Sequence, residues 1–169
     1  NAANSIPAGN GAYDWYVPGI ATTNGKIRIY DTYGANIIDQ SDNVFTIATM
    51  QVTSPNGGEG FLVGSIQPIS WTTSSVTNIN IEYSTNNGGS WVSIVTNVLS
   101  STGSYNWTIP NVPTSQALVR IVDASEPTYF DASDNVFKIG NLQVVSPNGS
   151  EIFQSGKPYT ITWSNTSNI

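Results

Sequence analysis

"NINIEYSTNNGGSWVSIVT" (78–96) has the pattern of two short strands joined by a tight turn. In its first part, 78–85, apolar and polar residues alternate, and "NNGG" (86–89) interrupts the alternation. Asn and Gly accept the positive φ that tight hairpin turns require. A second strand-like run, 90–96, follows directly. The segment therefore predicts a β-hairpin and indicates a β rather than an α fold.

Similar runs lie on both sides of this hairpin, and no stretch of the chain shows a sustained 3.6-residue periodicity. We expect further strands at 50–55, 61–73, 104–110, 116–123 and 135–139. With the hairpin, these make seven strands within one stretch of 92 residues. Such a pattern predicts an all-β protein built on an Ig-like or fibronectin-III-like seven-stranded β-sandwich.

An aromatic stripe identifies the expected core. In "SYNWTI" (104–109), Trp107 and Ile109 fall on the same face of the predicted strand. An exposed stripe of this kind can stack on sugars, whereas a buried one forms a core. The same alternation recurs at 13–17, which favours the core. The predicted core residues are Trp71, Trp107, Leu118, Ile121 and Phe137.

The chain repeats itself at a spacing of 92 residues. "GAYDWYVP" (11–18) aligns with "GSYNWTIP" (103–110), and "SDNVF" occurs at 41–45 and again at 133–137. Between 11–71 and 103–163, 26 of 61 positions are identical without a gap. Chance would give a handful of identities, so we interpret the pattern as a tandem duplication. The period equals one Ig-sized sandwich.

The register of the repeat predicts three parts. Residues 1–47 correspond to the C-terminal half of a repeat, 48–140 to one complete repeat, and 141–169 to the N-terminal part of the next. Halves of this size are too small to fold alone. Either the chain is a window on a longer repeat protein, or its ends complement each other between neighbouring chains. In both cases we expect end-to-end contact with copies of itself or with neighbouring repeats.

Composition limits the function further. Only 9% of residues are charged and the net charge is −6. The few basic residues are widely scattered: Lys26, Arg28, Arg120, Lys138 and Lys157. This distribution argues against nucleic acid and anionic membranes as partners. A surface made polar by Ser, Thr, Asn and Gln is typical of secreted and cell-surface β proteins, so we expect an extracellular location.

The residue types that most enzymes use are also missing. The chain has no His and no Cys, which excludes serine-type triads, thiolate sites and most transition-metal sites. A carboxylate pair for glycoside hydrolysis needs a cleft and one carboxylic acid with a raised pKa, which suits a seven-stranded sandwich poorly. No 18-residue apolar run is present, so membrane insertion is not expected. We therefore expect a protein that is not an enzyme.

The order "SPNGGE" (54–59), "ISW" (69–71), "YSTNNGGSW" (83–91), "SYNWTIP" (104–110), "VRIVD" (119–123) and "SDNVFKI" (133–139) resembles a known repeat. It is similar to the Ig-like repeat of the Ser/Thr-rich GPI-anchored, fungal cell-wall-synthesis family. The resemblance covers the complete repeat and part of both flanking pieces. It implies an extracellular, non-catalytic β-sandwich used in tandem, with no catalytic residues and no defined ligand.

Acidic residues recur in both copies and form the candidate site. They are Asp39, Asp42, Glu59, Asp131, Asp134 and Glu151. Asp39 and Asp42 precede the last strand of one repeat and Glu59 follows the first strand of the next, so they could converge at a domain joint. Calcium takes six to eight oxygen ligands, which carboxylates and turn carbonyls supply. The alternative is that the aspartates cap their own loops. The EF-hand loop pattern is missing, which favours loop caps.

These observations leave two functions open. The first is a structural or adhesive repeat of an extracellular filament, stalk or surface-layer protein. The second is a spacer or carbohydrate-binding module of a secreted hydrolase, in contact with surface glycans. A filament protein would carry further 92-residue repeats, whereas an accessory module would lie beside a catalytic domain.

Overall fold

The computed structural model describes residues 6–32 and 38–167 of the chain. The chain divides into two compact units, residues 1–49 and 50–169. Its regular secondary structure is almost entirely β-strand. The helical segments in the described residues are two short 3-10 turns, η1 (Ala8–Asn10) and η2 (Ser100–Thr102). The prediction of an all-β protein is thus confirmed.

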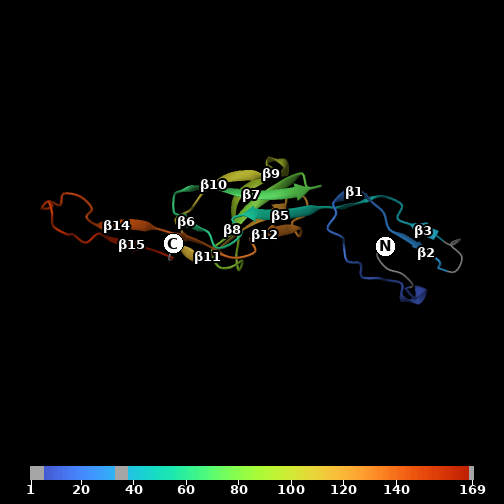
Figure 1. Ribbon diagram of the computed structural model, residues 1–169. Helices are drawn as coiled ribbons and strands as arrows, with labels where there is room; N and C mark the ends of the chain where they lie inside the picture. The colour runs from blue at the N-terminus through green and yellow to red at the C-terminus, as the bar shows by residue number, and fades with distance from the viewer. Residues whose placement is uncertain (1–5, 33–37, 168–169) are drawn as a thin grey trace. The chain divides into compact units, whose positions relative to one another are not determined.

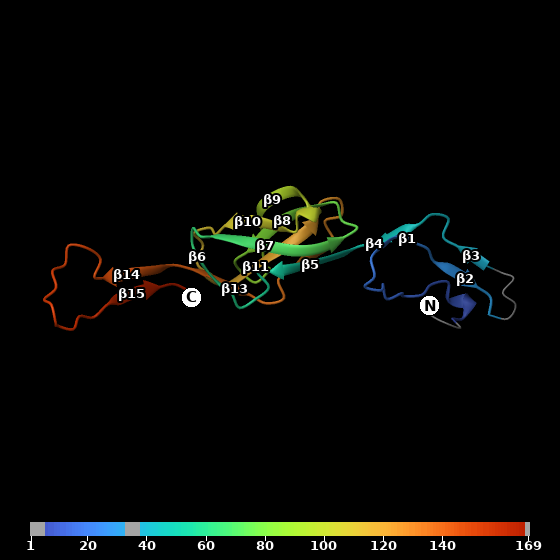
Figure 2. The same ribbon diagram turned by 45° about the horizontal axis from the view of Figure 1, so that its top comes forward.

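Nine strands between residues 49 and 140 form a body that we call the central sandwich. They are β5 (Thr49–Ser54), β6 (Gly60–Leu62), β7 (Ile66–Ser74), β8 (Asn78–Ser84), β9 (Val92–Leu99), β10 (Ser104–Thr108), β11 (Thr114–Asp123), β12 (Phe130–Ala132) and β13 (Phe137–Gly140). One sheet has the order β10-β7-β5 and the other β6-β13-β11-β8-β9, with β12 beside β11. Figures 1 and 2 show these strands in two layers, a β-sandwich-like arrangement.

The core lies between the two sheets. The ring of Trp107 on β10 contacts Tyr83 of β8 at 5.3 Å and Phe137 of β13 at 6.3 Å between ring centroids, so its contacts cross from one sheet to the other. All five predicted core residues are at most 9% exposed. That part of the sequence interpretation is confirmed. Complete burial of side chains this size contributes about 1.5–3 kcal/mol each.

The hairpin predicted at 78–96 is formed by β8 and β9. Its turn places Asn87 at φ 54° and Gly88 at φ 83°, the left-handed region that Asn and Gly tolerate. The hydroxyl of Ser84 holds the turn closed, because its Oγ accepts hydrogen bonds from Asn86 N (3.2 Å) and Gly88 N (2.9 Å). The hairpin turn that NNGG (86–89) predicted is therefore confirmed, with positive φ at Asn87 and Gly88.

Two expectations about strands were wrong. A single strand was predicted at 61–73, but the chain turns at Gly64, which has φ 77° and donates from its N–H to Ile109 O at 2.9 Å. The break lets β6 join one sheet, in parallel with β13, while β7 joins the other, antiparallel to β10. The short strand β12 was also missed. The central sandwich accordingly has nine strands rather than seven.

The N-terminal unit contains two small sheets. Strand β1 (Thr22–Gly25) pairs with β4 (Phe45–Ile47), and β2 (Arg28–Tyr30) pairs with β3 (Ile38–Gln40). The ring of Phe45 packs edge-on against Trp15 at 5.8 Å between centroids. Most other large apolar side chains here are at least one-third exposed, so this unit has little core of its own.

A two-stranded sheet follows the central sandwich. Strand β14 (Leu142–Ser146) pairs antiparallel with β15 (Thr162–Asn165), with Val144 opposite Trp163. We call residues 142–165 the C-terminal hairpin. Its apolar side chains are largely exposed.

Candidate functional site

In the central sandwich the two repeated motifs lie side by side, although 78 residues separate them in sequence. We call 54–59 the SPNGGE turn and 133–137 the SDNVF loop. The amide of Asn56 donates from Nδ2 to Asp134 Oδ2 at 2.8 Å, and Asp134 N donates to Asn56 Oδ1 at 2.7 Å. The backbone adds a bond from Asn135 N to Asn56 O at 3.3 Å. The arrangement locks the entry and exit segments of the sandwich together.

Glu59 shapes the SPNGGE turn. Its carboxylate accepts hydrogen bonds from Asn56 N and Gly57 N, both at 2.8 Å. A carboxylate that accepts from backbone N–H groups makes charge-assisted bonds, which are stronger than neutral ones. Its own carbonyl accepts from Lys138 N at 2.8 Å, which connects the turn to β13. The role of Glu59 that the geometry supports is to hold the turn.

Asp131 and Ser133 connect the SDNVF region to the strands around it. Asp131 Oδ2 accepts from Val52 N at 2.7 Å. The buried Ser133 hydroxyl donates to Pro55 O at 2.8 Å and accepts from Val119 N at 3.1 Å. Ser133 thereby satisfies polar backbone groups of two neighbouring segments where water is excluded, which makes it costly to remove.

Gly57 allows the two loops to approach. Its φ is 127°, and an added Cβ would lie 2.4 Å from the Cβ of Asn135. Both the backbone conformation and the close contact therefore require glycine. The aligned residue, Gly149, has φ 123°, but an added Cβ there would meet nothing within 4 Å.

The remaining predicted site residues lie in the two flanking parts. Asp39 lies on β3 opposite Ile29, and the carbonyl of Asp42 accepts from Lys26 Nζ at 3.3 Å. Glu151 in the C-terminal hairpin accepts from Asn148 N and Gly149 N, both at 2.7 Å. These backbone hydrogen bonds, led by the one from Asn148, lower the pKa of Glu151.

The structure brings Glu59 and Asp134 to a common neighbour, Asn56, within one sandwich. The sequence interpretation expected Asp39, Asp42 and Glu59 to converge at a joint between repeats, and that expectation stays a prediction. The hydrogen bonds described for Asp131 and Asp134 go to residues 52–56. Within residues 6–32 and 38–167, no group of three or more His, Cys, Asp or Glu side chains is placed to hold a metal ion.

Asp123, which recurs as Asp31 in the other copy of the repeat, also accepts hydrogen bonds in a loop. Asp123 Oδ1 accepts from Ser125 N at 2.8 Å and Ser125 Oγ at 2.6 Å. Partial burial acts to raise the pKa of Asp123, but these bonds and a further one from Glu126 N outweigh it, and the pKa is lowered. The nearby Tyr129 has a raised pKa because of burial and the negative charges of Asp131 and Asp123. Asp123 thus acts as a fixed acceptor for the backbone of its own loop.

Residues that the sequence interpretation overlooked carry much of this geometry. Asn56, Gly57 and Ser133 were not singled out as site residues. Each is identical to its counterpart 92 residues away, namely Asn148, Gly149 and Ser41. The identity of these residues between the two copies could have marked them as site residues. They were not selected because only ionisable side chains were considered as candidates.

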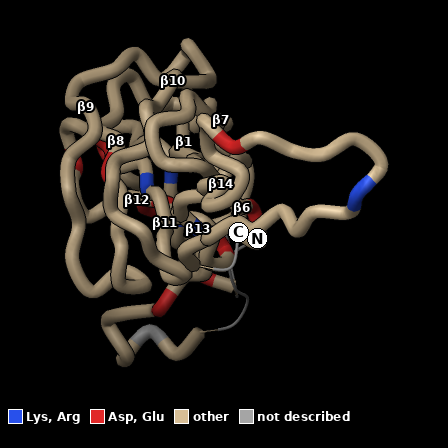
Figure 3. Tube along the Cα trace, turned by 90° about the vertical axis from the view of Figure 1, so that its left-hand side faces the viewer, with Lys and Arg blue, Asp and Glu red and all other residues tan. Residues whose placement is uncertain are grey.

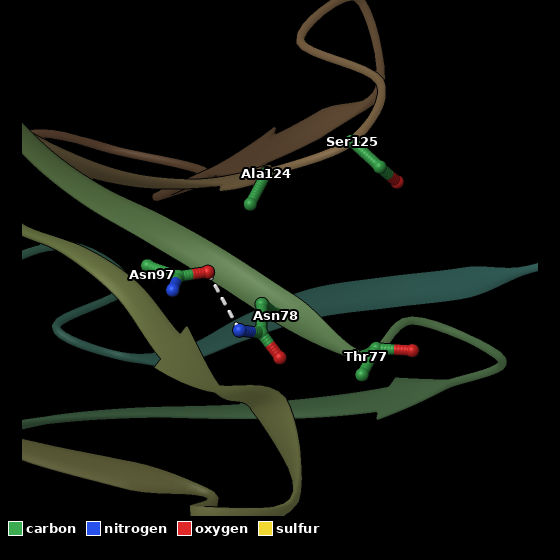
Figure 4. A pocket seen from close by; sticks show the side chains of 5 residues that line it. All are labelled: Thr77, Asn78, Asn97, Ala124 and Ser125. Carbon is green, nitrogen blue, oxygen red and sulfur yellow. Dashed lines mark hydrogen bonds between the residues drawn. The ribbon is translucent and has the colours of Figure 1, made fainter.

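Two open hollows accompany the loops. A polar one of about 370 Å³ is lined by Thr77, Asn78, Asn97, Ala124 and Ser125, and Figure 4 shows the hydrogen bond from Asn78 Nδ2 to Asn97 Oδ1 (2.6 Å) at its centre. An apolar one of about 380 Å³ lies on the C-terminal hairpin, lined by Leu142, Val144, Ile161 and Trp163. No titratable side chain lines either hollow, so neither supports acid–base chemistry.

Charged residues are sparse along the chain, as Figure 3 shows. In the described segments, no helix has the length and apolar character needed to cross a membrane. Comparisons with protein-family models, with curated proteins and with solved structures found no match to this chain. The site geometry and the internal sequence correspondence therefore carry the functional argument.

Proposed function

We propose that this protein is a non-catalytic structural or adhesive element of an extracellular filament, stalk or surface layer, built from Ig-like sandwiches in tandem that join end to end. The observation that carries the proposal is the residue-for-residue correspondence between the central sandwich and the segments on either side of it. The correspondence holds in sequence on both sides and, for the paired strands of the N-terminal unit, also in strand register.

Strand pairing supports the proposal. In the N-terminal unit, β2 and β3 pair Arg28 with Gln40 and Tyr30 with Ile38. In the central sandwich, β11 and β12 pair Arg120 with Ala132 and Val122 with Phe130. Every residue of the second pairing lies 92 positions after its counterpart in the first. The sequence repeat and the strand pairing therefore share the same offset of 92 residues. A chain of equivalent domains would have this property.

Short connections between successive strands fit the same role. Only Ala48 separates β4 from β5, and only Asn141 separates β13 from β14. A one-residue connection leaves little chain to act as a flexible linker. Together with loops held by Asn56, Asp134 and Glu59, this favours a load-bearing element over a module tethered loosely to an enzyme.

The alternative, a glycan-binding module of a secreted hydrolase, is supported by one surface cluster. The Arg120 guanidinium lies 4.4 Å from the ring centroid of Trp91 and 5.3 Å from that of Phe130, and its ion pair with Glu82 is 2.6 Å long. Aromatic rings beside polar groups can bind sugars. Here, however, the Arg120 guanidinium already lies over the rings of both Trp91 and Phe130, which argues against sugar binding at these rings.

Electron microscopy and a polysaccharide-binding assay of the same 169-residue chain test the proposal. We expect linear particles with a repeat of about 35–45 Å, the length of one sandwich with its loops, and no retention on insoluble polysaccharides. Dispersed monomers that bind glycans, with binding abolished by Trp91→Ala, would overturn it in favour of the alternative.

A further inference from the structure

We infer that the C-terminal hairpin of one copy binds the N-terminal unit of a second copy of this chain, so that the two form a composite sandwich at each junction. The inference rests on the end-to-end assembly proposed above and adds the surfaces that make it. The occupant of the apolar hollow on the hairpin is thus the N-terminal unit of another copy, through its described residues 8–32 and 38–47.

The apolar face of the hairpin is the first observation. Val144, Ile161 and Trp163 are 48–63% exposed. Their counterparts 92 residues earlier, Val52, Ile69 and Trp71, are at most 3% exposed because the other sheet of the central sandwich covers them. A contiguous apolar face of this kind marks an interaction surface. The sequence correspondence identifies the partner, since counterparts of β11, β12 and β13 from the covering sheet are present in the N-terminal unit.

The N-terminal unit presents the complementary face. Ile29 and Val17 are 66% and 51% exposed, whereas the aligned Ile121 and Ile109 are buried in the central sandwich. Strands β1 and β4 pair Thr22 with Ile47, in the register by which β11 and β13 pair Thr114 with Ile139. The unit therefore reproduces the pairing of β11 with β12 and with β13, while residues 12–16, the counterpart of β10, are not in a strand.

The loop at 147–151 of the C-terminal hairpin, which we call the hairpin loop, is also held in the conformation that docking requires. Gly149 has φ 123°, close to the 127° of Gly57, and Glu151 holds the loop by the same two backbone bonds as Glu59. In the central sandwich this conformation receives the SDNVF loop, but the space beside Gly149 is open. The second copy of SDNVF, at 41–45, is the segment of the chain that fits there.

Specific polar contacts follow from this register. Trp71 Nε1 donates to Ser100 O at 2.7 Å at the 3-10 turn η2, which ends at Gly103 with φ 69°. The aligned turn η1 also ends at a left-handed glycine, Gly11, with φ 65°. We therefore place the indole N–H of Trp163 on the carbonyl of Ala8 of the second copy, and the amide of Asn148 on the carboxylate of its Asp42.

Two complementary variants test the junction. Trp163→Asp blocks the hairpin, and Ile29→Asp blocks the N-terminal unit. Both residues are mostly exposed within one chain, so the central sandwich should unfold as in the wild type. Each variant alone should stay at 18.0 kDa in sedimentation, because burying an unpaired carboxylate weakens the junction by about 100-fold or more. An equimolar mixture should form a 1:1 dimer through its one intact hairpin and one intact N-terminal unit.

Matched controls carry the same charge change outside the proposed contact. Ile152→Asp and Tyr16→Asp alter side chains that are 95% exposed, and their counterparts Gly60 and Thr108 are also exposed. Both variants should assemble like the wild type. Equal loss of assembly in the controls, or a mixture that stays monomeric, would overturn the inference and point to nonspecific association or to closure within one chain.

The two proposals fail in different ways. If the wild type forms linear particles and both blocked variants do so as well, the junction is wrong but the filament function stands. If the wild type is monomeric at every concentration, the junction is wrong; if it also binds polysaccharide, the filament function is wrong too.

Discussion

Asn56 and Asp134 exchange two hydrogen bonds, side chain to side chain at 2.8 Å and side chain to backbone at 2.7 Å. One residue lies just after the first strand of the central sandwich and the other just before its last. The pair thus closes the sandwich where the chain enters and leaves it. The SDNVF motif was considered from the sequence as part of a metal site. In this geometry it connects two loops by hydrogen bonds.

Asn56→Ala should destabilise the central sandwich by about 1 kcal/mol, since it removes both bonds to the partly exposed Asp134. Urea unfolding with a global fit of the midpoint and slope measures this. Asn148→Ala is the matched control, because Asn148 occupies the same turn in the C-terminal hairpin. If both variants shift the unfolding midpoint equally, the stabilising role of the Asn56–Asp134 pair is refuted.

Gly57→Ala should destabilise the central sandwich by about 2 kcal/mol or more, because the added methyl group meets Asn135 at 2.4 Å in a backbone conformation that already strains alanine. Gly149→Ala introduces the same backbone strain without that contact. It should leave unfolding of the central sandwich unchanged and weaken assembly of the chain. The measurements are chemical unfolding and sedimentation, and a stable Gly57→Ala protein would contradict the loop packing.

The hairpin loop should respond to acid below the usual pKa of a glutamate. Backbone hydrogen bonds lower the pKa of Glu151 in the folded loop, so their contribution is complete above the ordinary value of 4.5. It is lost as the pH falls through the lower folded value. Amide resonances of Asn148 and Gly149 should therefore shift together below pH 4.5. Glu151→Gln should abolish that titration, and a midpoint above 4.5 would show that the bonds do not favour the carboxylate.

Calcium should not change the stability of this chain. Glu59, Asp131 and Asp134 each accept hydrogen bonds from the protein, and these bonds already stabilise the carboxylates. We expect the same Tm in excess calcium and in a chelator, measured by calorimetry. A calcium-dependent rise in Tm that disappears in Asp134→Asn would instead establish the metal site considered from the sequence.

The strands and the core were readable from the sequence because both depend on local patterns. Alternation placed Trp107 inward, and "NNGG" required a hairpin turn. Strand β12 was not predicted because its three residues carry no alternation, and its strand conformation depends on pairing with β11. The break at Gly64 between β6 and β7 was not predicted either, because a single glycine within an apolar run is also compatible with a continuous strand.

The site was harder to predict because its partners are distant in sequence. The acids were recognised as repeated, and loop capping was expected for the aspartates. Asp123 does accept from its own loop, whereas Asp131 and Asp134 accept from Val52 and Asn56, which are distant in sequence. Their neighbours were assigned by proximity along the chain, which suggested a joint between repeats. The assembly of β5, β6 and β13 determines that the SDNVF loop contacts the SPNGGE turn. This assembly depends on tertiary packing, which local sequence patterns do not show.

The parallel pairing of β6 with β13 determines how the central sandwich would carry tension. It joins Gly60 to Lys138 and Leu62 to Gly140. Pulling on the two ends of the chain draws these strands in opposite directions along their own axes. The hydrogen bonds between them are then loaded in shear and must break together, whereas an antiparallel terminal pair pulled at one end would open one bond at a time.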